Sequence, residues 1–308
     1  MSEAVVFEDF SAELAGREVL RRVSFAVASG EVAAVFGRTG SGKSCIALAL
    51  CDRLTGCGGS ARILGRDVAV TFKTPVNRPI SIGFQSPCYA PELTVQENLE
   101  LQSVLWRTPR RKRTGRIAFL MQLLGLEPLQ RVRAGKLSDG QKRALEIARA
   151  LLPETPVVVL DSLLDHIDPD IRNKLFRNLF DSANREKSAF LIATRDAEIA
   201  ELCDRVVLLD SGRALAADSP ENLRANAPDE IVVTQTADNP VLRRRIAERF
   251  QVVVREENGG LVFSHPNADL VAAELLSELE SQVTCVRVRR QSLYEIVDSL
   301  SAEERRQP

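Results

Sequence analysis

The chain has 308 residues, of which 44% are hydrophobic, and its 41 lysines and arginines nearly balance its 42 aspartates and glutamates. This length favours two domains of unequal size, each able to bury a core. The formal net charge of −1 excludes a strongly basic protein, so we expect no nucleic-acid partner.

The six cysteines, at positions 45, 51, 57, 88, 203 and 285, form no CxxC pair, and neither histidine lies near a cysteine in the sequence. This spacing argues against a disulfide framework or a zinc site and suits reduced thiols in a cytosol. The N-terminal MSEAVVFEDF lacks the pattern of a secretory signal, and no run reaches the ~18 apolar residues of a membrane span. We therefore expect a cytoplasmic protein, which would serve a membrane from its aqueous side.

Short apolar runs alternate with amphipathic stretches through the first two thirds of the chain. The apolar runs predict strands of a parallel sheet covered on both faces, at residues 32–36, 157–160, 189–193 and 206–209. Helical spacing between these runs predicts helices at residues 44–54, 116–124, 141–152 and 171–184. The alternation predicts an α/β domain over residues 1–226.

One basic run, RTPRRKR at residues 107–113, leads into a predicted helix. A run of this kind can contact acidic lipid or RNA, but most charge runs are hydrated faces. We interpret it as a solvated surface.

Polar, proline-bearing sequence at residues 217–221 and 225–230 predicts a domain boundary. Beyond it, residues 227–308 predict a small α+β domain with a ferredoxin-like order of elements. The expected strands are 231–234, 251–255, 261–264 and 283–288, the expected helices are 240–249 and 269–280, and a turn is expected at 256–260. This part of the sequence contains no phosphate-loop or metal motif, so we predict a regulatory or docking role for it.

Residues 37–44, GRTGSGKS, fit the pattern GxxxxGK[ST] between a predicted strand and a predicted helix. The glycines let backbone N–H groups point at phosphates, and the start of the helix adds partial positive charge. Lys43 can reach the outer phosphates and Ser44 can bind Mg²⁺. The flanking elements disfavour the alternative of a plain Gly/Ser turn. The expected nucleotide-binding residues are Gly37, Arg38, Thr39, Gly40, Ser41, Gly42, Lys43 and Ser44.

Two further segments gain meaning from this loop. The apolar strand at 157–160 ends in Asp161, and such a carboxylate holds the Mg²⁺ shell in phosphate-loop proteins. In LSDGQ, Ser138 and Gln141 have the spacing of a capping box, which alone predicts only a well-capped helix.

The order and spacing of these segments resemble the ABC ATPases over roughly the first 225 residues. The matching motifs are GRTGSGKS (Walker A), IGFQSP with Gln85 (Q-loop), LSDGQ (signature), VVVLD (Walker B) and HIDP with Asp168 (D-loop). The resemblance implies that ATP and Mg²⁺ bind, with the metal held by Ser44, Gln85 and Asp161. It also implies head-to-tail pairing, in which each signature closes over the partner's ATP through Ser138, Gly140 and Gln141.

The resemblance further implies two kinds of partner at the inner face of the cell membrane. The Q-loop would face membrane-spanning permease subunits, and the second ATPase would form a homodimer or a heterodimer with this chain. Residues 286–300, VRVRRQSLYEIVDSL, resemble the closing segment of the small C-terminal domain of many ABC-2-type exporter ATPases. This second resemblance favours export over import.

The sequence departs from the family at both positions that run hydrolysis. Ser162 stands where the family has its catalytic glutamate, and a serine hydroxyl is too weak a base at neutral pH. Arg195 stands at the position of the switch histidine; it can pair with a γ-phosphate but cannot act as a neutral imidazole. Neither His166 nor His265 lies at the switch position.

The sequence departs from the family at four other positions, and the changes at Leu14 and Asp139 are the milder ones. Leu163 and Leu164 replace the usual Pro-Thr, and Leu14 aligns with the aromatic residue that stacks on adenine. Asp139 replaces the first signature glycine. A carboxylate ~6 Å from the partner's phosphate would cost roughly 3 kcal/mol at an effective dielectric of 20, but the helix dipole can favour a position turned away.

These departures predict a subunit that binds Mg·ATP and hydrolyses it weakly, with catalysis coming mainly from a partner ATPase. One alternative is an active homodimeric exporter ATPase with an unusual base. Asp165 is the nearest candidate, but at three residues from Ser162 it is expected to need a rearranged loop. The other alternative is a non-transport ABC protein, an ATP-gated scaffold or translation-associated factor. Such proteins usually carry two nucleotide-binding domains, whereas this chain has one.

Overall fold

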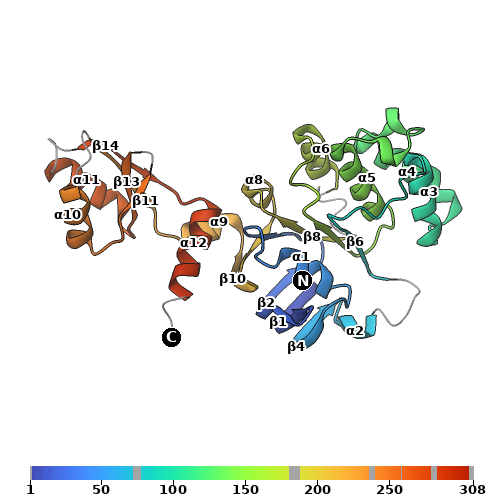
Figure 1. Ribbon diagram of the computed structural model, residues 1–308, viewed down its shortest axis with the longest axis horizontal. Helices are drawn as coiled ribbons and strands as arrows, with labels where there is room; N and C mark the ends of the chain where they lie inside the picture. Colours follow the sequence, from blue (N-terminus) through green and yellow to red (C-terminus); the bar gives the residue numbers. More distant parts are fainter. Residues whose placement is uncertain are drawn as a thin grey trace. The chain divides into compact units, whose positions relative to one another are not determined.

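The computed structural model describes residues 2–71, 78–179, 188–235, 240–257, 259–278 and 283–304. Its contacts divide the chain into two compact units, residues 1–220 and 221–308 (Figure 1). The division falls in the proline-bearing stretch at 217–221. A regulatory or docking role for the second unit stays a prediction.

A six-stranded sheet of order β10-β9-β3-β8-β7-β6 forms the centre of the first unit. Neighbouring strands are parallel except for β10, which is antiparallel to β9. The strands β3, β7 and β8 are buried along their whole length, as continuous apolar runs require when both faces are covered. The bounds are β3 (Val32–Phe36), β6 (Ile80–Gly83), β7 (Val157–Asp161), β8 (Ala189–Thr194), β9 (Arg205–Asp210) and β10 (Arg213–Asp218). The four predicted strands are confirmed to within one residue at each end.

A second, antiparallel sheet of order β2-β1-β4-β5 was not predicted from the sequence. Its strands are β1 (Glu3–Leu14), β2 (Arg17–Ala28), β4 (Thr55–Ile63) and β5 (Arg66–Asp67). The hairpin between β1 and β2 turns through Ala15 and Gly16, which both have the positive φ that a tight two-residue hairpin needs. Stacked rings of Phe7 and Phe25, with centroids 4.8 Å apart, belong to a core that this sheet shares with the parallel sheet.

Helices complete the first unit. They are α1 (Lys43–Ala49), α2 (Val68–Thr71), α3 (Val95–Leu105), α4 (Arg110–Leu123), α5 (Asp139–Leu151), α6 (Pro169–Leu179) and α8 (Ala197–Glu201), with short 3₁₀ turns η1 (Glu127–Leu129) and η2 (Ala134–Lys136). The predicted helix 44–54 was too long, because the chain turns after Ala49 and Asp52 has a positive φ. The predicted helix 116–124 was too short, since α4 begins at Arg110, directly after Pro109. Residues 180–184 of the last predicted helix lie outside the described residues.

The second unit contains a four-stranded antiparallel sheet of order β12-β13-β11-β14. Leu242 and Ile246 of one helix and Leu275 of another pack on Ile231 and Phe263 of the sheet. The bounds in this part of the chain are α9 (Pro220–Ala225), β11 (Glu230–Gln235), α10 (Pro240–Phe250), β12 (Arg255–Glu257), β13 (Gly260–Ser264), α11 (Ala268–Glu278), β14 (Val283–Arg289) and α12 (Leu293–Glu304).

The expected strand at 251–255 was wrong for all but its last residue. Gln251 adopts a positive φ after α10, so residues 251–254 connect that helix to β12 instead of pairing in the sheet. The helix α12 was not predicted. Residue 258 of the expected turn and residues 279–280 of the expected helix lie outside the described residues. Among the helices that the structure describes, none is long and apolar enough to cross a membrane.

A buried carboxylate holds the second unit together. Glu230, at the start of β11, is fully buried and forms ion pairs with Arg255 of β12 and with Arg289 of β14, the latter at 2.8 Å. Arg289 also pairs with Glu295 of α12 at 2.7 Å. Burial raises the pKa of Glu230, and the guanidinium groups of Arg289 and Arg255 offset part of that rise. These ion pairs join residues of the second unit only, and the same holds for its apolar core.

We predict that residues 1–226 fold without residues 231–308, because each unit has a core of its own. A chain that ends at Asn226 should be soluble, should melt cooperatively by circular dichroism and should bind ATP with the affinity of the full chain. An insoluble product, or a loss of ATP binding, would show that the first unit depends on the second.

Candidate functional site

The carboxyl ends of neighbouring parallel strands meet at one edge of the six-stranded sheet. Phe36 at the end of β3 is in register with Thr194 of β8, and Asp161 at the end of β7 is in register with Ala193. Loops that leave these strands therefore start side by side. In open α/β sheets, ligands bind at this edge.

A cavity of about 640 Å³ opens at this edge, a size suited to a small ligand. Predicted site residues supply half of its lining: Thr39, Gly40, Gly42, Lys43, Ser44, Gln85, Ser162 and Arg195. The other half comes from residues that were not assigned to the site: Glu18, Val19, Arg21, Cys45, Asp165, His166, Ser211 and Gly212. Gly40 and Gly42 of the phosphate loop both have a positive φ. Glycine adopts this conformation readily, whereas residues with a side chain rarely do.

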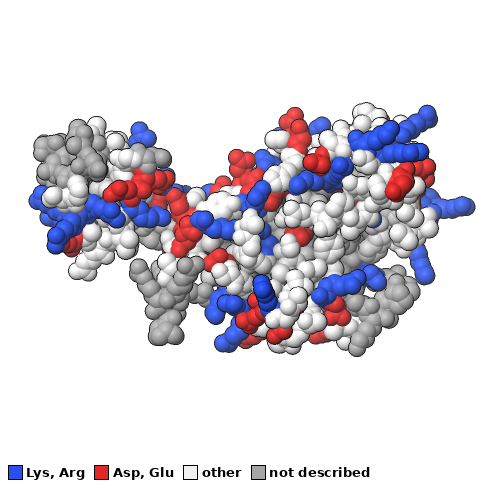
Figure 2. Space-filling model, viewed as in Figure 1, with Lys and Arg blue, Asp and Glu red and all other residues white. Residues whose placement is uncertain are grey.

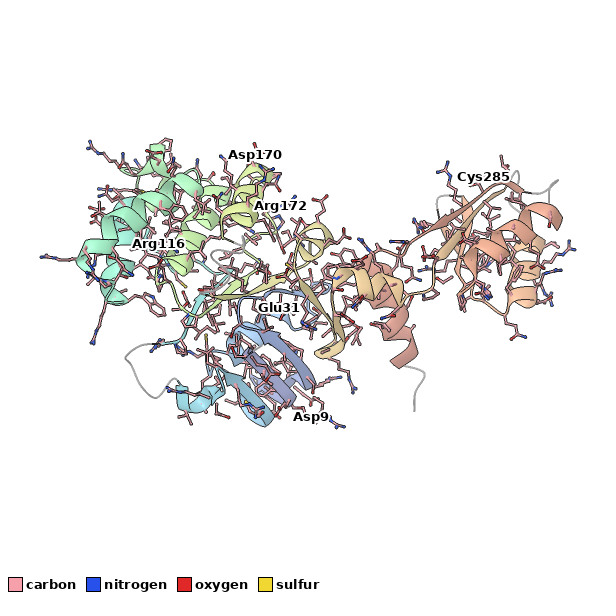
Figure 3. The ribbon with its side chains drawn as sticks, turned by 180° about the vertical axis from the view of Figure 1, so that it is seen from behind. Asp9, Glu31, Arg116, Asp170, Arg172 and Cys285 are labelled. Atoms are coloured by element: carbon pink, nitrogen blue, oxygen red, sulfur yellow. The ribbon has the colours of Figure 1, made fainter. Side chains whose placement is uncertain are left out.

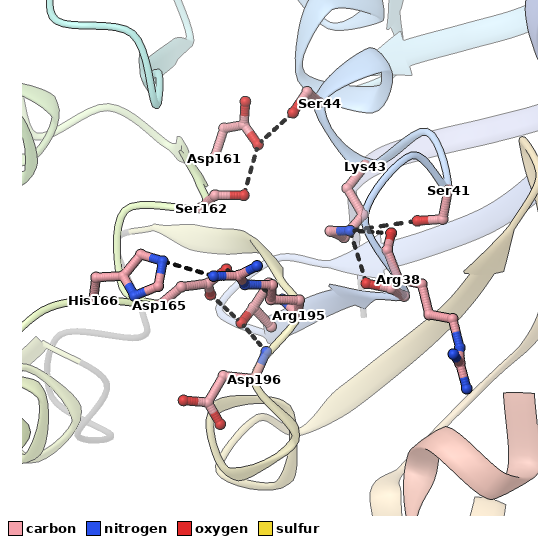
Figure 4. Close-up of polar contacts among 12 residues, drawn as sticks. Arg38, Ser41, Lys43, Ser44, Asp161, Ser162, Asp165, His166, Arg195 and Asp196 are labelled. Carbon is pink, nitrogen blue, oxygen red and sulfur yellow. Dashed lines mark hydrogen bonds and ion pairs between the residues drawn. The ribbon is translucent and has the colours of Figure 1, made fainter.

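The ammonium of Lys43 is held by the loop itself (Figure 4). Its Nζ donates to the carbonyl oxygens of Gly37 at 2.7 Å and Arg38 at 2.8 Å, and lies 3.4 Å from Oγ of Ser41. The residue is only 7% exposed, and burial lowers the pKa of the ammonium. Neutral carbonyls therefore hold this cation, and a phosphate oxygen would be a stronger partner for it.

Gly37 permits this arrangement at the start of the loop. A Cβ at this position would lie 2.1 Å from the carbonyl oxygen of Leu209 in β9 and 2.7 Å from Oγ of Ser41. Any larger residue would push the loop off the end of β9, so the glycine fixes where the loop leaves the sheet.

Ser44 and Asp161 lie together at the start of α1 and the end of β7. Oγ of Ser44 donates to Oδ1 of Asp161 at 3.0 Å, and Oγ of Ser162 reaches the same oxygen at 3.4 Å. Burial raises the pKa of the Asp161 carboxyl, which is 3% exposed. A buried carboxylate beside a hydroxyl is a hard oxygen pair of the kind that binds Mg²⁺ together with phosphate oxygens. The residues present fit that metal, and Gln85 lines the same cavity.

Phosphate oxygens would be needed to complete such a metal shell. Over the described residues, no group of three or more His, Cys, Asp or Glu side chains could hold a metal ion. Mg²⁺ commonly takes one or two protein carboxylates plus substrate phosphates, and Asp161 and Ser44 could supply its protein ligands.

Ser162 is fixed by its backbone. It has a φ of 53°, unusual for a residue with a side chain, and its N–H donates to the carbonyl oxygen of Ala193 at 2.9 Å. The two residues after it, Leu163 and Leu164, are buried in the core. The position of the family's catalytic glutamate thus holds a hydroxyl that is turned toward Asp161.

The guanidinium of Arg195 is held by two residues of the loop that follows β7. Its Nη2 lies 2.9 Å from Nε2 of His166, and its Nε lies 4.0 Å from a carboxylate oxygen of Asp165. A guanidinium has no acceptor, so Nε2 of His166 is the acceptor in this contact. Asp165 is also the acceptor for the hydroxyl of Thr194 and, at 3.3 Å, for the backbone N–H of Arg195.

Asp196, which follows Arg195 after the end of β8, is anchored as well. Asp196 caps α8, accepting from the N–H of Glu198 at 2.9 Å. Arg172, labelled on α6 in Figure 3, donates to Asp196 at 3.2 Å and to Glu198 at 2.9 Å. Hydrogen bonds therefore fix the backbone at Arg195 and at Asp196. The exposed side chain of Arg195 is held in addition by His166 and Asp165.

Asp165 and His166 line the cavity, although the sequence did not assign them to the site. The side chain of Asp165 is 4% exposed. The expectation that it would need a rearranged loop to act as a base stays a prediction. His166 was set aside because it is not at the switch position, yet it contacts the residue that is. The two residues follow Asp161 by four and five positions in the sequence, in a loop that starts at the same edge of the sheet. This short separation was the only feature of the sequence that pointed to them.

The signature residues lie elsewhere, at the start of α5. Ser138 and Gln141 form the predicted capping box, with contacts of 2.9 and 3.4 Å, and neither they nor Gly140 line the cavity. The side chain of Asp139 is 93% exposed, and its carboxylate lies 3.5 Å from Nζ of Lys142. Their action on a partner's nucleotide stays a prediction.

Two other positions also lie outside the cavity lining. Asp168 accepts at 2.8 Å from the N–H of Asp170, at the start of α6. Leu14 is exposed at the end of β1, while Val19 of β2 lines the cavity instead.

Comparison with known proteins agrees with this geometry. The profile of the ABC transporter family matches residues 20–164. Nod factor export ATP-binding protein I of Rhizobium etli is 30% identical over 220 residues, which cover 71% of this chain and 69% of that protein. Thiamine import ATP-binding protein ThiQ of Jannaschia sp. is 34% identical over 196 residues, covering 63% and 84% respectively.

A solved structure described as the ATP binding subunit of an ABC transporter has the same fold. It is 26% identical, with a TM-score of 0.64, over 72% of this chain and 92% of that one. Sequence and fold agree, and this chain belongs to the ABC transporter family as an ATP-binding protein.

Proposed function

We propose that this chain is the ATP-binding subunit of a membrane ABC exporter and that its own site binds Mg·ATP but hydrolyses it weakly. Its partners are membrane-spanning permease subunits and a second ABC ATPase, paired with it as a dimer at the cytoplasmic face. One observation carries the proposal. Lys43 and Ser44, which can hold phosphate and Mg²⁺, line the same cavity as Ser162 and Arg195, which cannot activate water, and Asp161 is hydrogen-bonded to Ser44 beside it.

Support for export comes from the resemblance of residues 286–300 to the tail of ABC-2-type exporter ATPases. The Rhizobium relative, whose name describes export, agrees with it, whereas the ThiQ relatives are named for import. The proposal of export over import therefore depends mainly on residues 286–300.

Binding follows from the chain's own groups. Lys43 would exchange the carbonyls of Gly37 and Arg38 for outer phosphate oxygens, which are stronger partners for an ammonium. Ser44 and Asp161 would hold Mg²⁺, which supplies positive charge against the phosphates when bound. Arg195, held by Asp165 and His166, presents a second cation on the same cavity and is positioned to pair with the terminal phosphate.

Weak hydrolysis follows from the same geometry. A general base takes a proton from the attacking water, and it contributes ~10²–10⁴-fold in rate, or roughly 3–5 kcal/mol of barrier. The hydroxyl of Ser162 is a poor proton acceptor and already donates to Asp161. The imidazole expected at the switch position is replaced by a guanidinium that stays protonated.

A second candidate, an active homodimeric ATPase, is favoured by the place of Asp165 on the cavity wall. Its carboxylate could accept a proton from water. Against this, its oxygens already accept hydrogen bonds from the hydroxyl of Thr194 and from the backbone N–H of Arg195, so they are not directed at a water in the cavity. Replacement of Asp165 by asparagine separates the two candidates.

Replacement of Lys43 tests nucleotide binding. Lys43→Ala should weaken binding of Mg·ATP by about 10- to 100-fold, because a charge-assisted contact to the outer phosphates is lost. Lys174→Ala, at an exposed lysine of α6, is the matched control and should bind like the wild type. Equal affinities for Lys43→Ala and the wild type in a fluorescent-nucleotide titration would remove the basis of the proposed function.

Replacement of Asp161 tests the proposed metal role. Because burial raises the pKa of this carboxyl, its ionised form destabilises the nucleotide-free fold above that pKa. Asp161→Asn should therefore raise the melting temperature by a few degrees near neutral pH. The difference should disappear below the ordinary pKa of 3.8, where the carboxyl is protonated in both folded and unfolded chains.

The same Asp161→Asn variant should lose the extra thermal stabilisation that Mg²⁺ gives beyond ATP alone. Differential scanning fluorimetry with ATP plus EDTA, and with ATP plus Mg²⁺, measures this directly. A variant less stable than the wild type at neutral pH would mean that the hydrogen bonds from Ser44 and Ser162 outweigh the cost of burial. Unchanged Mg²⁺ dependence would remove Asp161 from the metal site.

Restoring the missing groups tests the cause of weak hydrolysis. The purified wild type should bind ATP but turn it over very slowly, and Ser162→Glu combined with Arg195→His should raise turnover by ~10²–10⁴-fold. A homodimer would retain Asp139 in each opposing signature, so Asp139→Gly is the natural third change.

The controls for this experiment are Ser162→Ala and Asp165→Asn. Both should leave the slow wild-type rate almost unchanged. Brisk wild-type turnover that survives Ser162→Ala and is abolished by Asp165→Asn would establish the second candidate instead. A triple variant that binds ATP and dimerises but stays inert would place the defect elsewhere, first at Leu163 and Leu164.

A further inference from the structure

The segment from the end of α3 through α4 is unusually cationic. Residues 101–126 contain six arginines and lysines and no aspartate or glutamate, although the whole chain is almost neutral. In Figure 2, lysine and arginine side chains project from the end of the first unit where Figure 1 labels α3 and α4. The sequence analysis interpreted its basic run as a solvated surface, but the structure adds an apolar component beside it.

The apolar component lies on the exposed face of α3. Leu101, Val104 and Leu105 are spaced three and four residues apart, so they lie on one helix face. Their exposed fractions are 43, 53 and 67%, while Val95 and Leu99 of the same helix are buried. Hydration of three adjacent aliphatic side chains is unfavourable, and a purely solvated face does not explain them.

The basic residues adjoin this apolar face. Arg107 has a positive φ, which reverses the chain between α3 and α4. Val104 and Arg110 line one shallow groove between the two helices. Arg113 donates at 2.7 Å to the carbonyl oxygen of Thr108, which fixes the start of α4 against this turn.

The cations on this surface are uncompensated. Arg107, Arg110, Arg111 and Lys112 are exposed, and none of their side chains forms an ion pair with another residue that the structure describes. The first turn of α4 has no acidic residue. The acids of α3 form no ion pair with these cations: Glu97 accepts from the N–H of Thr94, and Glu100, which lines the same groove as Arg110, accepts from the amide of Gln96.

We propose that this basic–apolar surface, made of Leu101, Val104, Leu105, Arg107, Arg110, Arg111 and Lys112, binds the surface of an anionic phospholipid membrane directly. Anionic headgroups attract the arginines and the lysine, and the aliphatic side chains enter the headgroup–acyl boundary. A nucleic acid would satisfy the cations but would leave the aliphatic side chains in water. The combination therefore favours lipid over RNA, and it gives the chain a membrane contact that needs no permease.

Trp106 provides an internal reporter. It is the chain's one tryptophan, and it caps the C-terminus of α3 between the apolar and the basic parts of the surface. With the full chain, vesicles of phosphatidylcholine plus phosphatidylglycerol should shift the Trp106 emission to shorter wavelength. Brominated acyl chains should quench it. Binding should be at least about tenfold tighter than to pure phosphatidylcholine and should weaken as salt is added.

Single substitutions locate the contact. Leu105→Glu and Arg111→Glu should each reduce co-sedimentation with the anionic vesicles by about tenfold or more, by removing an inserted side chain or reversing a charge. Both side chains are exposed, so the variants should fold and bind ATP like the wild type. A measurement of ATP binding therefore checks that each variant is folded. The matched controls are Leu202→Glu and Lys174→Glu, at exposed positions outside this surface, which should bind vesicles like the wild type.

Three outcomes would overturn the proposal. The first is equal binding to neutral and anionic vesicles, or none to either. The second is vesicle binding that survives both Leu105→Glu and Arg111→Glu, which would place the lipid contact elsewhere. The third is binding to a single-stranded RNA that is tighter than to anionic vesicles and insensitive to Leu105→Glu, which would identify the surface as a nucleic-acid site.

Discussion

The candidate site depends on burying opposite charges at the carboxyl edge of the parallel sheet. Desolvation opposes the charge of Lys43, and the carboxylates of Asp161 and Asp165 offset part of that cost. The same burial disfavours the ionised form of Asp161, whose charge Lys43 and two serine hydroxyls support. The nucleotide-free site is thus strained electrostatically, and a ligand that brings both anionic oxygens and a divalent cation would relieve both groups at once. In the proposed function, this would be the physical reason that Mg·ATP suits the site better than either component alone.

The loop after β7 gives the site its individual character. The turn at Ser162 has a positive φ and sends Leu163 and Leu164 into the core, and this brings Asp165 and His166 back to the cavity. There they hold the guanidinium of Arg195. In the proposed function, the family's water-activating groups have been exchanged for a fixed cation. The loop that would otherwise serve hydrolysis serves phosphate binding.

The sequence predicted the parts of this structure that depend on local pattern. The strands β3, β7, β8 and β9 were predicted to within one residue, since buried parallel strands are continuous apolar runs. The sheet containing β1 and β2 was missed because its mixed burial and bulges obscure the alternation that marks a half-buried strand. In the site, the residues that hold Lys43 followed from the motif. The roles of Asp165 and His166 did not, because they depend on a turn whose direction no local pattern encodes.

A site that binds ATP and hydrolyses it slowly uses the nucleotide as a structural ligand. By mass action, a ligand at a hundred times its dissociation constant stabilises the state that binds it by about 2.7 kcal/mol, and hydrolysis ends that contribution. If Ser162 leaves the nucleotide intact, the contribution persists for as long as ATP is bound. In a pair of unequal ATPases this site would then set how firmly the subunits stay associated, while the partner's site sets the timing of the cycle. The fixed position of Arg195 suits the first task, because a permanently charged side chain gains from a terminal phosphate that remains in place.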